Sequence, residues 1–278
     1  MAKNKKRKLH NKSQASSRSH SQPLKAKPKD TQKKQQRSSL IVPFEPASDR
    51  ILLIGEGDFS FAKSVVEHHG ACDIVASCYD SKETLFEKYD PQAEEHITYL
   101  EEEGQTILYN VDATKLATNK ALKRNGEHFD VVMFNFPHVG GKSTDVNRQV
   151  RFNQELLVKF FTTSTSLLSQ SGTIVVTLFE GEPYTLWNIR DLARHSGLEV
   201  VRSFKFRAEA YPGYSHARTL GNVDGGGGWK GEEREARSYV FRKQVEDKSG
   251  VPLRQQQLRE QDKKKRQRDE DSSSDEEG

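Results

Sequence analysis

The sequence predicts an α/β fold in which a mostly parallel sheet of seven strands carries helices on both faces. Two observations lead to this prediction. Short apolar runs alternate with longer helical patterns from residue 49 to residue 242, and such alternation indicates parallel strands joined by crossover helices. The fourth predicted strand, residues 129–134, is apolar throughout, as expected for a strand that is buried on both faces.

The individual elements follow from residue type and periodicity. Branched and aromatic residues dominate each predicted strand; the strands are 51–54, 73–78, 106–109, 129–134, 173–179, 198–206 and 238–242. Apolar residues recur at helical spacing in each predicted helix; the helices are 59–68, 116–124, 147–168 and 187–195. A further, mostly polar helical region follows the second strand, is broken near Pro91 and ends at residue 103. These elements are enough for one well-buried domain of about 190 residues.

The two ends of the chain differ from this domain in composition. Residues 1–40 contain thirteen Lys and Arg and the single acid Asp30, a net charge of +12 against +4 for the whole chain. From Lys243 onward, basic and acidic blocks alternate without apolar periodicity. Neither end has enough apolar surface to offset the entropy that is lost on ordering. We therefore expect disordered tails over residues 1–48 and 243–278, on either side of a single domain over residues 49–242.

The basic N-terminal arm, residues 1–40, indicates a nucleic acid partner or nuclear import. Clustered Lys and Arg attract phosphates, and the run from Lys5 to Lys8 is of the kind that a nuclear import receptor reads. A solvated, solubilising tail is the alternative. No apolar run approaches the length needed to span a bilayer, so we expect no membrane contact. We expect Cys72 and Cys78, near a predicted buried strand, to be reduced packing residues.

Polar or glycine residues follow each of the first five predicted strands. A doubly wound sheet binds its ligand beyond the carboxyl ends of its strands, so these residues are expected to lie together. They are Gly55-Glu56-Gly57-Asp58, Asp80, Asp112, Asn135-Phe136-Pro137-His138 and Glu180-Gly181-Glu182. The set predicts a ligand site at one edge of the sheet.

The first turn reads Gly-x-Gly-x-x-Ser, from Gly55 to Ser60, and favours a nucleotide-like cofactor. A strand, a glycine turn and a helix often hold such a ligand, because glycines let the backbone approach it and helix N–H groups face it. Glu56 and Asp58 would repel a pyrophosphate but tolerate a sulfonium and an amino-acid ammonium. The turn with Gly57 at its centre therefore points to S-adenosylmethionine rather than NAD.

Two further acids complete the predicted cofactor site. Asp80 lies about where an acid takes ribose hydroxyls, and Asp112 is placed to reach the adenine amine. The alternative is that both residues cap the helical patterns that follow them. Ser81 is a second candidate for the cap after Asp80.

The end of the fourth strand resembles the Asn-Pro-Pro-Tyr or Asp-Pro-Pro-Tyr element of amino- and base-methyltransferases. Here it reads Asn135-Phe136-Pro137-His138. In that element the Asn side chain and backbone carbonyls grip the nitrogen that is alkylated, an aromatic ring stacks on the base, and proline fixes the turn. The alternative is a proline turn in which His138 is merely packed or hydrogen-bonded.

Seven segments together resemble the eukaryotic 25S-type ribosomal RNA uridine-N3 methyltransferase domain. They are residues 54–62, 79–81, 112–114, 134–141, 153–157, 177–184 and 211–216. The resemblance implies a Rossmann-like class I methyltransferase that uses S-adenosylmethionine and methylates N3 of a uridine in large-subunit ribosomal RNA. It further implies ribosomal RNA or a pre-60S particle as partner and a location in the nucleus and nucleolus. We expect a monomer.

A uridine substrate sets specific chemical demands. Uridine N3 carries a proton and is a weak nucleophile, so the proton must be removed or shared while N3 is aligned. His138 is the first candidate for the base, because its unperturbed pKa lies near neutrality. Glu180 and Glu182 are the alternative bases. Asn135 would hold the imide edge, and Pro137 would set the turn.

The target base would have to leave its stack to reach this pocket. Phe136 or Tyr211 would then stack on it. Tyr214, His216 and Arg218 lie on the loop after the sixth strand and would close the substrate side, because such residues stack on and hydrogen-bond unpaired bases. The alternative is that this loop is a flexible connection with no role in binding. This alternative is best supported for the glycine run from Gly225 to Gly228.

Two other functional classes remain open from the sequence. A nicotinamide-dependent oxidoreductase shares the first glycine turn, but it would be expected to lack the Asn135–His138 element and the basic arm. A ribosome-assembly or RNA-binding factor could keep a methyltransferase fold without turnover. The latter would still bind RNA after Asn135→Ala or His138→Ala.

Overall fold

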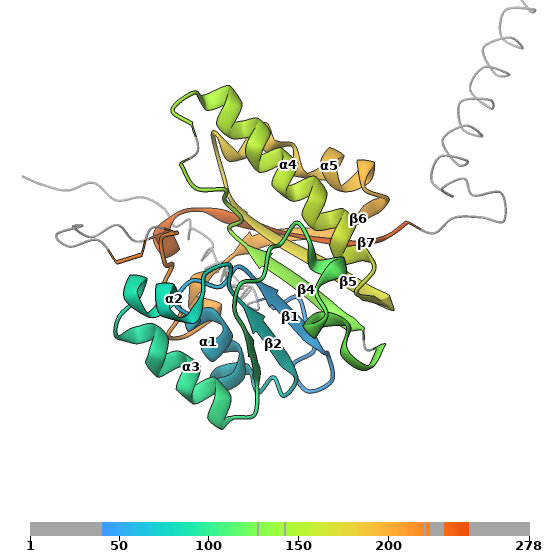
Figure 1. The fold of residues 1–278 in the computed structure, drawn as a ribbon. Helices are drawn as coiled ribbons and strands as arrows, with labels where there is room; N and C mark the ends of the chain where they lie inside the picture. Colours follow the sequence, from blue (N-terminus) through green and yellow to red (C-terminus); the bar gives the residue numbers. More distant parts are fainter. Residues whose placement is uncertain (1–40, 127, 142, 220, 223–230, 245–278) are drawn as a thin grey trace, which may run out of the picture. The chain divides into compact units, whose positions relative to one another are not determined.

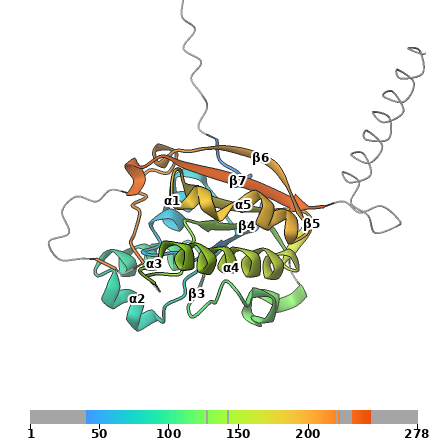
Figure 2. The same cartoon turned by 90° about the horizontal axis from the view of Figure 1, so that it is seen from above.

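The structure, a computed structural model, describes residues 41–126, 128–141, 143–219, 221–222 and 231–244. Their strands form one seven-stranded sheet in the order β3-β2-β1-β4-β5-β7-β6 (Figure 1). The strands are β1 (Ile51–Ile54), β2 (Ile74–Ser77), β3 (Thr106–Leu108), β4 (Phe129–Asn135), β5 (Leu168–Phe179), β6 (Leu198–Phe206) and β7 (Ala236–Lys243). The strands from β3 to β5 pair in parallel, and β7 runs antiparallel between β5 and β6 (Figure 2). The predicted mostly parallel, seven-stranded sheet is confirmed.

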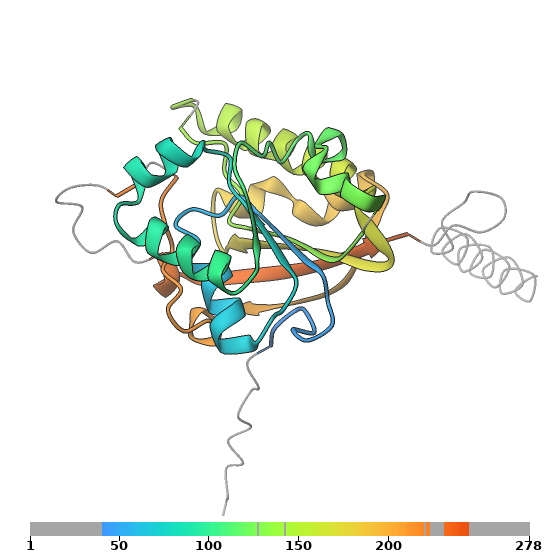
Figure 3. The same cartoon turned by 60° about the horizontal axis from the view of Figure 1, so that its bottom comes forward.

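Helices cover both faces of this sheet, and α1 and α4 lie on opposite sides of the strands (Figure 3). The α-helices are α1 (Ser60–His69), α2 (Lys82–Lys88), α3 (Gln92–Glu102), α4 (Val146–Thr165) and α5 (Ile189–His195). Short 3₁₀ helices are η1 (Leu116–Thr118), η2 (Ala121–Gly126), η3 (Tyr184–Trp187), η4 (Ala208–Ala210) and η5 (Gly231–Glu233).

Alternation along β1 divides the core into two layers. Ile51 and Leu53 pack in the cluster that includes the buried residues of α1 and α3. Leu52 and Ile54 pack in the opposite cluster, with Phe160 of α4. Successive side chains of a strand point to opposite faces, so a strand with helices on both sides has to be apolar at every position. The sequence of β1 meets this requirement, and all four of its residues are buried.

The predicted helix over residues 116–124 is wrong. The segment forms η1 and η2 instead, with a break at Asn119. The side chain of Asn119 accepts a hydrogen bond from the backbone N–H of Ala121 at 2.9 Å. Asn side chains compete with the helix for backbone groups in this way, and the α-helix is interrupted.

The boundary between α4 and β5 also differs from the prediction. We expected a helix to residue 168 and a strand from 173, but α4 ends at Thr165 and β5 begins at Leu168, which pairs with Phe129. The register between the two strands shifts just after this pair. Gly172 lies at the shift, where a Cβ atom would come within 2.8 Å of the Phe129 carbonyl oxygen. Gly172, which directly precedes the predicted strand, therefore lies inside β5 and permits the close contact.

The predicted helix over residues 187–195 begins later than expected. Asn188 has a φ of 49°, in the left-handed region, and separates η3 from α5. At the N-terminal side, Phe44 is buried against His69, with ring centroids 6.1 Å apart, although it lies within the predicted 1–48 tail. Residues 1–40 and 245–278 of the predicted tails lie outside the described residues, as does the run Gly225 to Gly228.

Both cysteines are free thiols in this fold. Cys78 is buried, as expected of a packing residue, whereas Cys72 is exposed and the packing role predicted for it is wrong. No helix within the described ranges combines the length and apolar character needed to cross a membrane.

Candidate active site

A cavity of about 840 Å³ opens at the carboxyl ends of the central parallel strands. Its volume lies within the roughly 300–1,000 Å³ typical of small-molecule sites. Among the site residues predicted from the sequence, those that line it are Gly55, Glu56, Gly57, Asp58, Ser60, Asp80, Asp112, Asn135, Phe136, His138, Tyr214, His216 and Arg218. The ends of the first four predicted strands therefore meet at one site, whereas Glu180, Gly181 and Glu182 after the fifth strand do not line it. The role of each residue stays a prediction.

The two glycines of the first turn are required by protein packing. Gly55 has a φ of +72°, and a Cβ there would come within 2.5 Å of the Phe134 ring. A Cβ on Gly57 would come within 2.7 Å of the Cβ of Ala217. The first contact joins β1 to β4, and the second joins the turn to the segment after β6. The sequence predicted that a ligand would approach the backbone closely at these glycines. In the structure, side chains of the protein itself lie close to both of them.

The acids of the turn occupy the N-terminus of α1. Glu56 Oε2 accepts a hydrogen bond from the Ala62 N–H at 3.2 Å, and Asp58 Oδ1 accepts one from the Ser60 N–H at 3.0 Å. These N–H groups lack partners within the helix and would otherwise be available to a phosphate. A pyrophosphate would meet donors already in use beside two carboxyl groups. The role predicted for this turn, holding the cationic amino-acid end of S-adenosylmethionine, stays a prediction.

Glu56 has an unusual protonation equilibrium. Burial of its carboxyl group raises the pKa of Glu56 to about 8. The hydrogen bond from Ala62 opposes this rise, and the nearby charge of Asp58 adds to it. A cation bound beside this carboxyl group would favour its ionised form and lower the pKa.

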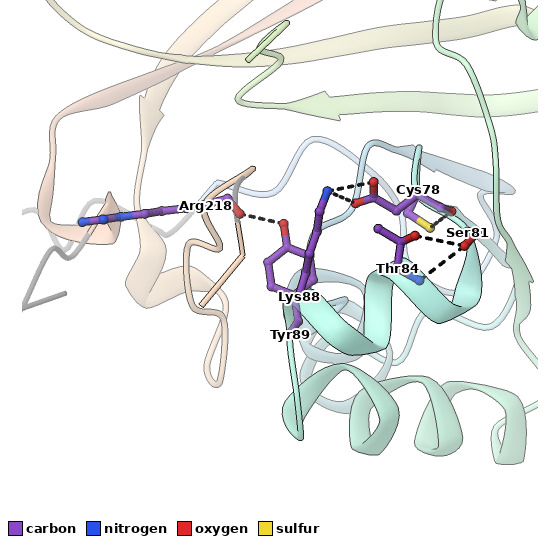
Figure 4. Close-up of polar contacts among 7 residues, drawn as sticks. Cys78, Ser81, Thr84, Lys88, Tyr89 and Arg218 are labelled. Carbon is purple, nitrogen blue, oxygen red and sulfur yellow. Dashed lines mark hydrogen bonds and ion pairs between the residues drawn. The ribbon is translucent and has the colours of Figure 1, made fainter. Parts of the chain in front are cut away.

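Asp80, at the end of β2, is held by a lysine that the sequence reasoning did not identify. Lys88 Nζ, from the last turn of α2, donates to both carboxylate oxygens of Asp80 at 2.8 Å (Figure 4). The cap of α2 is Ser81, whose Oγ accepts from the Thr84 N–H at 3.3 Å. Asp80 therefore does not cap the helix, and its carboxylate lines the cavity together with Lys88.

Asp112 caps a local turn and not the helix that follows, which begins at Leu116, and its predicted contact with the adenine amine stays a prediction. Its Oδ1 accepts hydrogen bonds from the Thr114 N–H at 2.8 Å and the Thr114 hydroxyl at 2.6 Å, and its Oδ2 lies 3.2 Å from Lys115 Nζ. Burial alone would raise the pKa of Asp112, but these contacts outweigh it and the pKa is lowered. Asp112 thus stabilises a local turn and also lines the cavity as a carboxylate.

The last residue of β4 and the loop that follows it, together residues 135–141, are held in place by α4. Asn153 is fully buried; its Oδ1 accepts from the Val139 N–H at 3.0 Å, and its Nδ2 donates to the Gln149 carbonyl at 2.8 Å. The Gln149 side chain in turn donates to the Gly140 carbonyl. The Gly140 N–H donates to His138 Nδ1 at 3.0 Å. Gln149 had no signal in the sequence, and Asn153 had only its place in the family resemblance.

Asn135 and Phe136 begin this loop. Asn135 Oδ1 is buried and accepts no hydrogen bond from the residues that the structure describes. Phe136 has a φ of 51°, and its N–H donates to the Thr177 carbonyl of β5 at 2.8 Å. The Phe136 ring lies 4.5 Å from the ring centroids of both Phe179 and His216. Pro137 is buried behind this turn and does not line the cavity, which is compatible with the predicted task of setting the turn.

The segment after β6 forms the wall opposite the glycine turn. Ser60 Oγ donates to the Ser215 carbonyl and accepts from the Ser215 N–H, each at 3.1 Å. The Tyr89 hydroxyl donates to the Arg218 carbonyl at 2.6 Å (Figure 4), and the Asn222 N–H donates to the Lys88 carbonyl at 2.7 Å. Residues 214–219 and 221–222 are thus fastened to α1 and to the end of α2; we call them the roof segment.

Within this region Tyr211 has a different place from the one expected. Its ring stacks on Phe206, with 5.5 Å between centroids, and it is only 3% exposed. Burial raises the pKa of Tyr211. Because the ring is used in the core and does not line the cavity, stacking on a substrate base is no longer expected of it. Tyr214 and His216 do line the cavity, and the Tyr214 hydroxyl lies 2.9 Å from His216 Nδ1.

The alternative bases suggested by the sequence lie elsewhere. Glu180 Oε1 accepts a hydrogen bond from Arg237 Nε at 2.6 Å. Neither Glu180 nor Glu182 lines the cavity. Both are therefore poorly placed to take a proton from a ligand in it.

The chain is similar in sequence to one protein family and to several known proteins. A family model described as "BMT5-like: rRNA (uridine-N3-)-methyltransferase BTM5-like" matches residues 52–218. The chain is 32% identical over 260 residues to the 25S rRNA (uridine(2634)-N(3))-methyltransferase of Saccharomyces cerevisiae, which covers 75% of this chain and 76% of the yeast protein. It is 35% identical over 175 residues to heavy metal-associated isoprenylated plant protein 41 of Arabidopsis thaliana, covering 62% of this chain and 33% of that protein.

A solved structure of a putative methyltransferase from Thermoplasma acidophilum also matches. The two proteins share 12% identity, over 70% of this chain and 68% of the other, with a TM-score of 0.41.

Proposed function

Because the chain belongs to the BMT5-like family of rRNA (uridine-N3-)-methyltransferases, we propose that it methylates N3 of a uridine in large-subunit ribosomal RNA. The observation that carries the proposal is the meeting of two loops in one cavity. The acid-bearing turn at residues 55–60 suits a cationic cofactor, and the loop at 135–141 presents an amide and an imidazole to a planar base.

S-adenosylmethionine is the cofactor of this reaction, and when bound it supplies an electrophilic methyl group. We assign its amino-acid end to Glu56 and Asp58, because these acids are fixed beside the N-terminus of α1. Asp80 would hold the ribose hydroxyls and would share its carboxylate with Lys88. Asp112 would accept from the adenine amine.

The uridine would enter from the side of the β4 loop. Asn135 lines the cavity and would hold the imide edge of the base, and Phe136 is held in the adjoining aromatic cluster. Tyr214, His216 and Arg218 of the roof segment would surround the flipped base. These contacts would orient N3 toward the methyl group, and orientation of this kind contributes much of the rate of a two-substrate reaction.

The surrounding RNA has a candidate docking surface on the first two turns of α4. Val146 and Phe152 are 60% and 36% exposed there, and Arg148 and Arg151 are exposed on the same two turns. Phe152 also lines the cavity. Aromatic and cationic side chains at the mouth of a pocket suit a single-stranded RNA segment, which stacks on rings and pairs its phosphates with cations. We name Val146, Arg148, Arg151 and Phe152 the α4 surface.

The basic arm would add to this interaction and direct the protein within the cell. We propose that residues 1–40 contact ribosomal RNA phosphates in a pre-60S particle and engage a nuclear import receptor. The protein would then act as a monomer in the nucleolus. After deletion of residues 1–40, RNA affinity is expected to fall much less steeply with rising salt concentration. The shortened protein is also expected to move from the nucleus to the cytoplasm.

The test is methyl transfer in vitro, followed by mass spectrometry of digested RNA. The purified protein, S-adenosylmethionine and large-subunit ribosomal RNA should yield N3-methyluridine, and Asp80→Ala should weaken cofactor binding in calorimetry. Saturable binding of NAD but not of S-adenosylmethionine would contradict the cofactor assignment. The RNA is supplied both as naked ribosomal RNA and as pre-60S particles. The proposed activity would be contradicted if the protein binds the cofactor and the RNA but methylates neither form of the RNA.

A further inference from the structure

The hydrogen bond from Gly140 to His138 determines which ring nitrogen carries the proton. A backbone N–H can only donate, so Nδ1 of His138, 3.0 Å away, must be the acceptor. A neutral imidazole has one N–H group, and it therefore lies on Nε2. The side chain reaches solvent at the mouth of the cavity, but the surrounding protein still desolvates it, and burial lowers the pKa of His138. The neutral ring thus presents a donor at Nε2.

This arrangement is built into the loop. The Val139 N–H is fixed by the buried Asn153, and the Gly140 carbonyl is fixed by the side chain of Gln149. Both anchors come from α4, so the peptide that carries the Gly140 N–H is held on both sides. The His138 ring lies beside Trp187, with 6.2 Å between centroids. The ring therefore has a defined place in which Nδ1 remains the acceptor.

A nitrogen that already carries a proton cannot accept another. Nε2 of the neutral His138 is therefore unsuited to remove the proton from uridine N3, which is the role that the sequence suggested for this residue. Protonation of the ring would not change this, because both nitrogens of an imidazolium are donors. In either state His138 can donate from Nε2.

We propose that His138 donates a hydrogen bond from Nε2 to a carbonyl oxygen of the target uracil and so stabilises the negative charge that develops when N3 loses its proton. This inference rests on the proposed function. When the N3–H bond breaks, its electron pair stays on the base and is shared among N3 and the two carbonyl oxygens, and the proton passes to water. The N3 pair then forms the bond to the methyl carbon, and the pair of the carbon–sulfur bond stays on sulfur as a neutral thioether. A fixed donor aimed at a developing oxyanion lowers the barrier to such a step.

The first experiment is independent of turnover. Long-range ¹H–¹⁵N correlation spectra of the full chain, free of ligands, report the tautomer of each histidine ring, and the signals of His138 are assigned by their loss in His138→Gln. We expect a protonated Nε2 and an unprotonated Nδ1. A ring with the proton on Nδ1 would overturn the proposal.

The second experiment compares two substitutions at the same position. Glutamine places an N–H donor near the position of Nε2 but is not a base, whereas alanine offers neither group. At saturating cofactor, we expect the single-turnover rate of His138→Ala to fall by about 10²-fold and that of His138→Gln to fall by no more than about tenfold. Equal losses in the two variants would overturn the proposal. His195→Gln, on the exposed side of α5, is the matched control and should keep the wild-type rate.

The pH profile gives a third, separate test. With water as proton acceptor, the rates of the wild type and of His138→Gln should rise together with pH through and above neutrality. An inflection below pH 7 that the wild type has and His138→Gln lacks would identify His138 as the base and overturn the proposal. The cavity also contains Glu56, Asp58, Asp80, Asp112, Glu155 and His216, and the comparison cancels their contributions because they are common to both proteins.

Failure of this inference is distinguishable from failure of the proposed function. If the wild type makes no N3-methyluridine, the function itself is contradicted, whatever the tautomer. Unchanged affinity of both His138 variants for S-adenosylmethionine shows that they are folded. If the wild type is active but His138 carries its proton on Nδ1, only the role given to His138 is contradicted. The same holds if the wild type is active and the two folded His138 variants lose activity equally.

Discussion

The two loops that meet in the active site are held in different ways. The turn at residues 55–60 carries internal supports in addition to its contact with Ser215, because Glu56 and Asp58 cap backbone N–H groups only six and two positions away. The loop at 135–141 is stabilised from outside, by Asn153 and Gln149 of α4. A motif that carries its own supports can be recognised in a sequence, whereas one that depends on another element shows only its exposed residues. The comparison predicts that the β4 loop can be disrupted without affecting the cofactor turn.

The largest effect is expected for Asn153→Ala, which removes the support of the β4 loop. The Val139 N–H would lose its buried partner, at a cost of about 1–3 kcal/mol in the free energy of unfolding. Displacement of the loop by about 1 Å would lower the methylation rate by roughly 10²-fold. Denaturant unfolding and single-turnover assays measure these two quantities.

Cofactor affinity supplies the contrast for this variant. Asn153→Ala should bind S-adenosylmethionine as the wild type does, and the exposed Asn147→Ala on the same helix should match the wild type in every assay. A variant of Asn153 that loses cofactor affinity and rate together would show that the two loops are not independent.

The second prediction disrupts the cofactor turn instead. In Gly57→Ala the new methyl group would lie 2.7 Å from the Cβ of Ala217, and relief of such an overlap costs about 2 kcal/mol. Cofactor affinity should fall by about thirtyfold if this cost is met on binding. The double variant Gly57→Ala/Ala217→Gly removes the overlapping atom and should recover most of the affinity. Calorimetric titration that finds no recovery would assign the loss to some cause other than the roof contact.

The third prediction concerns pH and the cofactor turn alone. The pKa of Glu56 is about 8 in the folded protein and 4.5 for an ordinary glutamate. Between these values the native state binds more protons than the unfolded state, so the free energy of unfolding should decrease as pH rises through this window. A bound cation favours the ionised form of Glu56 and so lowers its pKa. Cofactor affinity should therefore increase as pH rises toward 8, by about tenfold for each pH unit by which the bound cofactor lowers this pKa.

Glu56→Gln removes this titration and is the control for it. Both the slope of stability against pH and the slope of cofactor affinity should flatten in the variant. Calorimetry in buffers of different ionisation enthalpy should also detect a proton released on binding to the wild type. Identical slopes in the two proteins would assign the pH dependence to another group.

The smallest effect is expected on the outer side of the helix that supports the β4 loop. Arg148→Ala and Arg151→Ala on the α4 surface should each weaken RNA binding by about threefold, and each should reduce the slope of log affinity against log salt by roughly one. Cofactor affinity should not change. Arg202→Ala, on the exposed strand β6, is the matched control. A loss of RNA affinity as large in Arg202→Ala would contradict a specific docking surface on α4.

The fold and the outline of the site could be predicted because both depend on regularities along the chain. Parallel strands bring their carboxyl ends to the same edge of a sheet, so the order of the predicted strands is enough to place Gly55, Asp80, Asp112 and Asn135 together. Their roles as ligands stay predictions.

Contacts between distant elements could not be predicted in the same way. The bond from Lys88 to Asp80 depends on the length and direction of α2, and the support of Val139 by Asn153 depends on how α4 packs. Tyr211 is of a residue type that often stacks on a substrate base, but its ring is buried because the segment that carries it folds back onto Phe206. In each case the deciding partner comes from packing in three dimensions, which the periodicity of the sequence does not encode.

The contact between Ser60 and Ser215 spans 155 positions of the chain. The glycine turn and α1 therefore leave the ribosome long before the roof segment that completes the cavity around them. The order of strands adds to this delay, because β7 fills the place between β5 and β6 only after everything else in the sheet has been translated. A nascent chain would thus have no complete cofactor site until synthesis of the domain is nearly finished. The protein would become competent to modify RNA only once the roof segment and β7 have joined the fold.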